Sequence, residues 1–178
     1  MRSERLTYEP LAVEHAAGLF AALDDERVGA YIGGPDVESV DATRQRITRV
    51  NEGPPADRPD ERWINHAVLL DVAGVGATVI GRVEATTYGD WGEIAYLLGP
   101  QWWGHGYATE ATAWMIDHLR DAHGVRELWA AVHADNAASM RLLERLGFVR
   151  VARPTRPLGS YDHGDVVFAN PAGLARHG

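Results

Sequence analysis

A glycine-containing stretch that joins a strand-like segment to a helix-like one could bind phosphate. It runs through Gln101, Trp102, Trp103, Gly104, His105, Gly106, Tyr107 and Ala108. The two glycines let the backbone turn sharply and expose several N–H groups, and the following helix adds the positive end of its dipole. Because main-chain donors hold phosphates in such a site, the N–H of His105 matters more than its ring. The stretch predicts a pyrophosphate site, with a tight connection that binds nothing as the alternative.

A carboxylate on the preceding strand could act as a base. Glu93 alternates with Trp91, Ala95 and Leu97, so these side chains share one face of the strand. Apolar neighbours would remove water from the carboxylate and favour its protonated form, which suits a group that takes up a proton near neutral pH. A structural role, exposed to solvent or paired with Arg82, is the alternative.

A second polar group lies in a short amphipathic segment, residues 136–148. Asn136 opens the segment, where an Asn side chain accepts a backbone N–H as a helix cap. Ser139 shares the same helix face, and its hydroxyl could donate a proton, although serine is a poor acid. Tyr161 is a more remote proton source. Arg141 could meet phosphates or could be an ordinary exposed arginine.

Hydrophobic periodicity predicts the elements that must position these groups. Strands are expected at residues 4–9, 63–72, 76–88, 91–98, 127–132, 148–153 and 164–168, and helices at 13–23, 37–50, 107–121 and 136–146. The short turn at 73–75 makes its two neighbouring strands an antiparallel hairpin. The order β-α-α-β-β-β-α-β-α-β-β predicts an α/β sandwich with a mixed central sheet flanked by helices, in one domain over residues 1–178.

The end of the strand at 91–98 is a further candidate site. Its last residues, Leu97 and Leu98, are followed by Gly99 and Pro100. Pro100 lacks an N–H and Gly99 permits a bend, so backbone groups near this point are freed from the ladder. A plain strand end is the alternative.

The glycine-containing stretch at residues 101–108, called the cradle below, and the segment at residues 136–148 together resemble the acetyl-CoA-binding motifs of the GNAT superfamily of N-acetyltransferases. Residues 101–106 match the family pattern Q/R-x-x-G-x-G/A, and residues 136–139 match N-x-x-[S/A]. The resemblance extends over residues 5–150 and looks strongest to the branch that contains the ribosomal-protein N-terminal acetyltransferases. Residues 153–159, between the last two strands, look shorter and more rigid than the matching family segment, which affects the acceptor-side wall.

The resemblance implies a GNAT-type mixed sheet, acetyl-CoA as cosubstrate and direct transfer of the acetyl group to a primary amine. Glu93 would be the general base, acting directly or through water. Relatives often place a tyrosine acid seven residues after the asparagine, but that position is Leu143, so Ser139 becomes the candidate acid. The implied cofactor-binding residues are Leu97, Leu98, Gln101, Gly104, His105, Gly106, Tyr107, Ala108, Asn136 and Arg141.

The amino-acid composition restricts which kinds of partner and cofactor are expected. The 17 basic and 25 acidic side chains give a net charge of −8, which opposes binding to nucleic acid and favours cationic acceptors. The absence of cysteine excludes a cysteine acyl-enzyme and thiolate metal sites, and the eight histidines show no paired ligand spacing, so no metal is expected. No apolar run approaches the roughly 20 residues that span a bilayer, so no membrane partner and a cytoplasmic location are expected.

The acceptor stays open at this stage. The family branch suggests the α-amine of a protein N-terminus, whereas a polyamine, an amino acid or an aminoglycoside-like compound fits the acidic charge equally well. The alternative from a different class is a catalytically silent acyl-CoA-binding or sensor module, which would keep the cradle and Asn136 but lack a working base. Because relatives often dimerise, a homodimer is also expected.

Overall fold

The computed structural model describes residues 1–32, 34 and 38–171, which form seven strands and five α-helices. In chain order these are β1 (Leu6–Pro10), η1 (Val13–His15), α1 (Ala16–Leu23), α2 (Glu26–Gly29), α3 (Val40–Asn51), β2 (Glu61–Val72), β3 (Gly76–Tyr88), β4 (Trp91–Leu98), η2 (Pro100–Trp102), α4 (Tyr107–His123), β5 (Glu127–Val132), α5 (Ala137–Arg145), β6 (Val149–Val151) and β7 (Val166–Pro171), where η denotes a short 3₁₀ helix. The expected α/β class with a helix-flanked mixed sheet is confirmed.

Most strand and helix ends differ by a few residues from the sequence prediction, and three differences have a physical reason. The short helix α2 was not expected; the Asp25 side chain caps it by accepting the N–H of Arg27. Position 37, the expected start of the second helix, lies outside the described residues, and α3 begins after Ser39, whose hydroxyl accepts the N–H of Ala42. The strand expected at 148–153 ends at Val151, because the nearby prolines cannot donate to a ladder.

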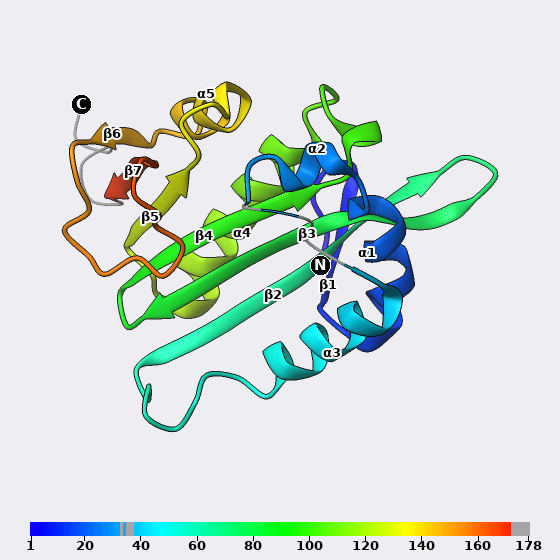
Figure 1. Ribbon diagram of the computed structural model, residues 1–178, viewed down its shortest axis with the longest axis horizontal. Coiled ribbons are helices and arrows are strands. Elements are labelled where there is room, and N and C mark those ends of the chain that lie inside the picture. Colours follow the sequence, from blue (N-terminus) through cyan, green and yellow to red (C-terminus); the bar gives the residue numbers. More distant parts are fainter. Residues whose placement is uncertain (33, 35–37, 172–178) are drawn as a thin grey trace.

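The strands form one sheet in the order β1-β2-β3-β4-β5-β7-β6. All neighbours are antiparallel except β4 and β5, which are parallel, and the predicted hairpin of β2 and β3 is confirmed. Helix α4 packs on one face, where Met115 and Leu119 are buried, and α1 and α3 cover the other face through Leu19, Leu23 and Ile47 (Figure 1). None of the helices in the described ranges is long and apolar enough to cross a membrane.

Strands β4 and β5 separate near the middle of the sheet. Their pairing is limited to Trp91–Glu127, Gly92–Leu128 and Glu93–Trp129. Beyond this point β4 stays with β3 as far as Leu98, while β5 stays with β7 as far as Val132. The two strands diverge visibly in Figure 1. The β5-facing backbone edge of residues 94–98 therefore has no strand partner among the described residues, and the sheet opens beside Glu93.

Candidate active site

The glycine stretch forms an exposed cradle between η2 and α4. Gly104 and Gly106 have φ values of 79° and 81°, in the left-handed region that favours glycine. Gly106 is the N-cap of α4 and supplies no side chain to cap it. As a result, the backbone N–H groups of residues 104–109 have no acceptor in the part of the chain that the structure describes. Free N–H groups at the positive end of a 17-residue helix suit a phosphate group.

The other predicted cradle residues lie around these N–H groups. Gln101 is exposed in η2, and the half-buried Tyr107 and Ala108 begin α4. The ring of His105 stacks on Tyr107 at 5.7 Å between centroids. The carbonyl of His105 accepts a hydrogen bond of 2.9 Å from Nη1 of Arg5, a residue that sequence reasoning did not single out.

The strand end before the cradle lies at the opening of the sheet. Leu97 and Leu98 come after the last β4–β5 pair, as the implied cofactor contact requires. The carbonyl of Leu98 accepts the indole N–H of Trp103 at 2.7 Å, which ties the cradle to the strand end. A Cβ at Gly99 would lie 2.4 Å from the carbonyl oxygen of Ala22, so only glycine fits at this close approach.

The start of α5 brings together two hydroxyl groups. Asn136 caps the helix by accepting the N–H of Ser139 at 3.0 Å, as predicted. The Ser139 hydroxyl lies 2.6 Å from the Tyr96 hydroxyl on β4. Burial raises the pKa of Tyr96 to about 12, while the hydrogen bond with Ser139 and the positive charge of Arg145 act in the opposite direction. Sequence reasoning missed Tyr96, although strand alternation places it on the face opposite Glu93.

A second arginine on α5 approaches the cradle. Arg141 is exposed and forms no hydrogen bond or ion pair with other described residues. Arg145, one helical turn later, donates to the hydroxyl of Thr109 at 3.2 Å, in the first turn of α4. The i,i+4 spacing of the two arginines was the signal that could have pointed to Arg145.

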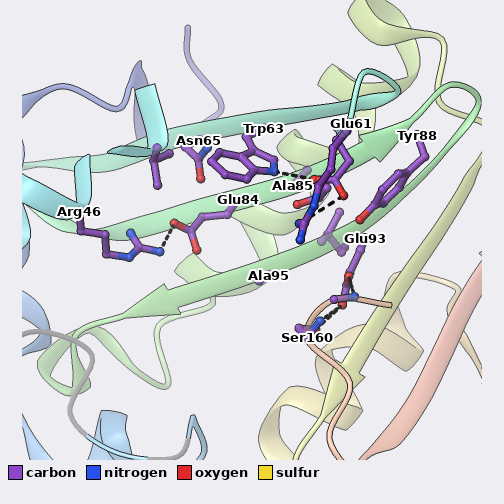
Figure 2. A pocket seen from close by; sticks show the side chains of 15 residues that line it. Arg46, Glu61, Trp63, Asn65, Glu84, Ala85, Tyr88, Glu93, Ala95 and Ser160 are labelled. Carbon is purple, nitrogen blue, oxygen red and sulfur yellow. Dashed lines mark hydrogen bonds and ion pairs between the residues drawn. The ribbon is translucent and has the colours of Figure 1, made fainter. Parts of the chain in front are cut away.

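Glu93 faces a cavity of about 360 Å³ on the other face of the sheet. Its walls come from α3, the three strands β2 to β4 and two short loop segments (Figure 2). The lining residues are Arg46, Val50, Arg58, Glu61, Trp63, Asn65, Glu84, Ala85, Thr86, Tyr88, Glu93, Ile94, Ala95, Gly159 and Ser160. Their mixed aromatic, acidic and basic character makes this the acceptor-side candidate.

Glu93 is only 6% exposed, and a loop holds its carboxylate. It accepts the N–H groups of Gly159 at 2.8 Å and Ser160 at 3.1 Å, together with the Ser160 hydroxyl. The expectation of apolar surroundings is therefore wrong, because the cavity is polar and the carboxylate is already hydrogen-bonded. The alternative partner, Arg82, binds Glu84 at 2.8 Å. To accept a proton from a substrate, Glu93 must take it through Ser160 or exchange one of its donors.

The charged residues of the cavity fall into two groups. Arg46 pairs with Glu84 at 2.9 Å (Figure 2), and Arg58 lies 3.6 Å from Glu61. The donors to Glu93 are all neutral groups within the described chain. Its negative charge is consequently the one that an incoming ammonium group would find least compensated.

The segment between the last two strands, residues 152–165, does reach the site. Arg156 forms an ion pair of 2.7 Å with Glu127, and its guanidinium lies 5.3 Å from the centre of the Trp91 ring. Together with the bonds to Glu93, this fixes the segment as a wall of the cavity. Residues 153–159, which look abbreviated and rigid in the sequence, are anchored by Arg156 and Gly159. Tyr161 lies on the same segment and is 39% exposed.

No cluster of three or more histidine, cysteine, aspartate or glutamate side chains in the described residues is arranged to hold a metal ion. The expectation that no metal takes part stays a prediction.

Comparison with known proteins identifies the family. Residues 5–149 match the family described as "Acetyltransferase (GNAT) domain". The "Uncharacterized N-acetyltransferase YoaA" of Bacillus subtilis (strain 168) is 26% identical over 152 residues, covering 83% of this chain and 81% of its own. The structure of RimL, a ribosomal alpha-N-protein acetyltransferase in complex with coenzyme A, is similar with a TM-score of 0.73 at 16% identity, covering 95% of each chain. The self-immunity acetyltransferase MccE, in complex with acetyl-CoA and AMP, gives 0.72 at 14% identity, covering 95% of this chain and 93% of its own. The two structures share the fold, and the match over residues 5–149 shows that the chain belongs to the GNAT family of acetyltransferases.

Proposed function

We propose that the protein transfers an acetyl group from acetyl-CoA directly to a primary amine bound in the cavity beside Glu93. One observation carries this proposal. Glu93 belongs to the last residue pair between β4 and β5, so its carboxylate lies at the point where the sheet opens and also faces the cavity. A base at this junction lies between a donor entering along the opening and an acceptor entering from the cavity.

The donor is held by main-chain groups. The N–H groups of residues 104–109 receive the pyrophosphate, and Arg141 and Arg145 add positive charge beside it. Leu97 and Leu98 lie where β4 no longer pairs with β5 and border the path of the pantetheine arm, and Asn136 meets its amides. Gln101 completes the rim of this site from η2.

Glu93 removes the proton that makes the amine unreactive. The nitrogen lone pair attacks the thioester carbonyl carbon, the new C–N bond forms and the C–S bond breaks. The proton passes from nitrogen to Glu93, through the Ser160 hydroxyl or a water molecule. With no cysteine in the chain, the acetyl group does not pass through a cysteine acyl-enzyme, which agrees with direct transfer in a ternary complex.

Ser139 protonates the departing thiolate. Its hydroxyl lies 2.6 Å from that of Tyr96, so the proton it gives up is replaced from the phenol. A thiol has an ordinary pKa of about 8.5, so the thiolate leaves at neutral pH with little help. The acid therefore contributes less to the rate than the base does.

The acceptor is an amine that arrives as a cation. Three glutamates line the cavity, and the net charge of −8 attracts cations at long range. The family branch and the fold shared with RimL favour the α-amine of a protein N-terminus, and a small-molecule amine is the second candidate. Neither nucleic acid nor membrane is proposed as a partner. A cytoplasmic location and a homodimer also stay predictions.

The proposal is tested by release of free CoA thiol from acetyl-CoA across a panel of peptide N-termini, polyamines, amino acids and aminoglycosides. Amine-dependent release, with an acetylated product of matching mass, supports the enzyme. A catalytically silent acyl-CoA-binding or sensor module would bind acetyl-CoA and release no thiol with any amine. Glu93, buried and facing the cavity, favours the enzyme over this alternative.

A further inference from the structure

Arg5, just before β1, connects the N-terminal segment to the cradle 100 residues later. Its backbone N–H and its Nε donate to the two carboxylate oxygens of Glu110, each at 2.7 Å. Its Nη1 donates to the carbonyl oxygen of His105 at 2.9 Å, and its guanidinium lies 4.6 Å from the centre of the Tyr107 ring. One side chain thus contacts the cradle and the first turn of α4 at three points.

Glu110 is itself held as a charged anchor. The Ser3 hydroxyl donates to it at 2.6 Å. Although burial alone would raise it, the pKa of Glu110 lies below its usual value because Ser3 and Arg5 donate hydrogen bonds to the carboxylate. The position of the Arg5 guanidinium is therefore determined by Glu110 before any ligand binds.

The contact with His105 has a geometric consequence for the next residue. In a planar trans peptide, the carbonyl of His105 and the N–H of Gly106 point in opposite directions. Gly106, with φ of 81° and no side chain, gives this peptide unit freedom to rotate. By holding the carbonyl on its own side, Arg5 directs the Gly106 N–H away from itself, to the open side of the cradle.

We propose that Arg5 is a positioning residue for acetyl-CoA: it fixes the peptide unit between His105 and Gly106 so that the Gly106 N–H faces the pyrophosphate. This inference rests on the proposed function of the cradle. Arg5 acts through the backbone, because its Nε and Nη1 are directed to Glu110 and to the His105 carbonyl. Lysine keeps the charge but lacks the planar fork that spans both partners.

The test compares Arg5→Lys and Arg5→Gln with wild type, using acetyl-CoA and S-acetylpantetheine as alternative donors. S-acetylpantetheine lacks the pyrophosphate, so its turnover depends on the rest of the active site and not on the cradle. We expect both variants to raise KM for acetyl-CoA about tenfold, the equivalent of one charge-assisted hydrogen bond, with kcat much less affected. Turnover with S-acetylpantetheine should change by less than about twofold. Arg2→Lys is the matched control, because Arg2 lies on the same segment and bonds only Thr7 among the described residues.

Three results would overturn the inference. An Arg5→Lys variant with wild-type KM for acetyl-CoA would show that charge, and not position, matters. Equal losses with both donors would show that Arg5 only supports the fold, and wild-type behaviour of Arg5→Gln would show that it does nothing. If the wild-type protein fails to bind acetyl-CoA by calorimetry, the proposed function fails and this inference fails with it. If the wild-type protein binds acetyl-CoA and the Arg5 variants bind it equally well, only the inference about Arg5 is wrong and the proposed function stands.

Discussion

The cradle at residues 104–109 offers main-chain N–H groups from one short segment, whereas the cavity around Glu93 is lined mainly by side chains of α3, β2, β3 and β4, together with Arg58 and residues 159–160. Main-chain donors are the same in every sequence, so the cradle requires little beyond glycines at two positions. The cavity depends on the identity of each side chain that lines it. Substitutions should therefore separate cleanly, those in the cradle affecting the donor and those in the cavity affecting the amine.

The largest effect is expected from Glu93→Gln, which keeps the shape of the side chain but removes the carboxylate that we propose as the base. We expect kcat/KM for the amine to fall roughly 10²-fold or more, with partial recovery at high pH where more of the amine is already neutral. Steady-state kinetics over a pH series measure this. CoA affinity by calorimetry should stay unchanged if the two sides are independent.

Glu61→Gln is the matched control for that substitution, since Glu61 lines the same cavity from β2. It should alter KM for the amine without recovery at high pH. Wild-type turnover by Glu93→Gln at neutral pH would mean that Glu93 only anchors residues 159–160.

Gly106→Val tests the other side of the comparison. A β-branched residue is strained at φ of 81°, and its Cβ would lie 3.4 Å from Nη2 of Arg5. We expect KM for acetyl-CoA to rise about 30-fold, between one and two charge-assisted hydrogen bonds, while KM for the amine changes little. Gly124, with φ of 67° at the other end of α4, provides the control. Gly124→Val should lower Tm by a similar amount and leave acetyl-CoA binding intact; a folded Gly106→Val with normal binding would remove the cradle from the site.

Ser139→Ala addresses the junction between the two sides. We expect kcat to fall about tenfold, with a larger loss at low pH for weakly basic amines. Tyr96→Phe should reproduce part of this loss, because it removes only the hydroxyl that lies behind Ser139. If acetyl-CoA binding weakens while kcat is kept, the Ser139 hydroxyl is a donor ligand, and Tyr161 or water becomes the proton source.

A third region, built from β1, β2 and the middle of α4, supplies a reference for pH effects. Tyr8, Trp114 and His118 stack in a row, with ring centroids 3.8 Å and 5.0 Å apart, and His66 packs edge-on against Trp114. Burial lowers the pKa of His66 to about 4, and the charge of His118 adds to the effect. The unfolded chain takes up this proton near pH 6.5, so it binds more protons than the folded chain between pH 6.5 and 4.

Folding stability should therefore fall as the pH drops through this range. We expect a loss of about 1 kcal/mol between pH 7 and 5.5, roughly a fivefold change in the folding equilibrium. Urea unfolding at several pH values measures it, and His66→Gln should flatten the dependence. An equally steep slope in that variant would assign the effect to other groups.

The sequence predicted the elements with regular patterns better than the contacts between them. β4 and β5 were placed correctly at 91–98 and 127–132, because alternation and buried runs are local signals. The four-residue α2 was missed because it is too short to show periodicity. Its capping hydrogen bond, from the N–H of Arg27 to the side chain of Asp25, becomes visible only in three dimensions. Arg5 could not be found from pattern alone, since its partner His105 lies 100 residues away.

The site shows the same division. Asn136 and the cradle glycines act through the backbone of their own segment, so their spacing in the sequence was sufficient to place them. The hydrogen bonds of Glu93 come from residues 159–160, in a segment whose path depends on the ion pair of Arg156 with Glu127. A carboxylate's surroundings depend on tertiary packing, and strand alternation alone does not give them.

The two faces of β4 also limit which sequence changes such a protein can accept during evolution. Glu93 looks toward the cavity and Tyr96 toward α5, from one continuous backbone. Gaining or losing one residue between them would place both side chains on the same face, so one of the two proposed proton-transfer groups would leave its site. Point substitutions along β2 and β3, or changes of length within residues 152–165, leave the register of β4 intact. New amine preferences should therefore arise from substitutions in the cavity wall. Strand β4 should tolerate substitutions but no insertion or deletion.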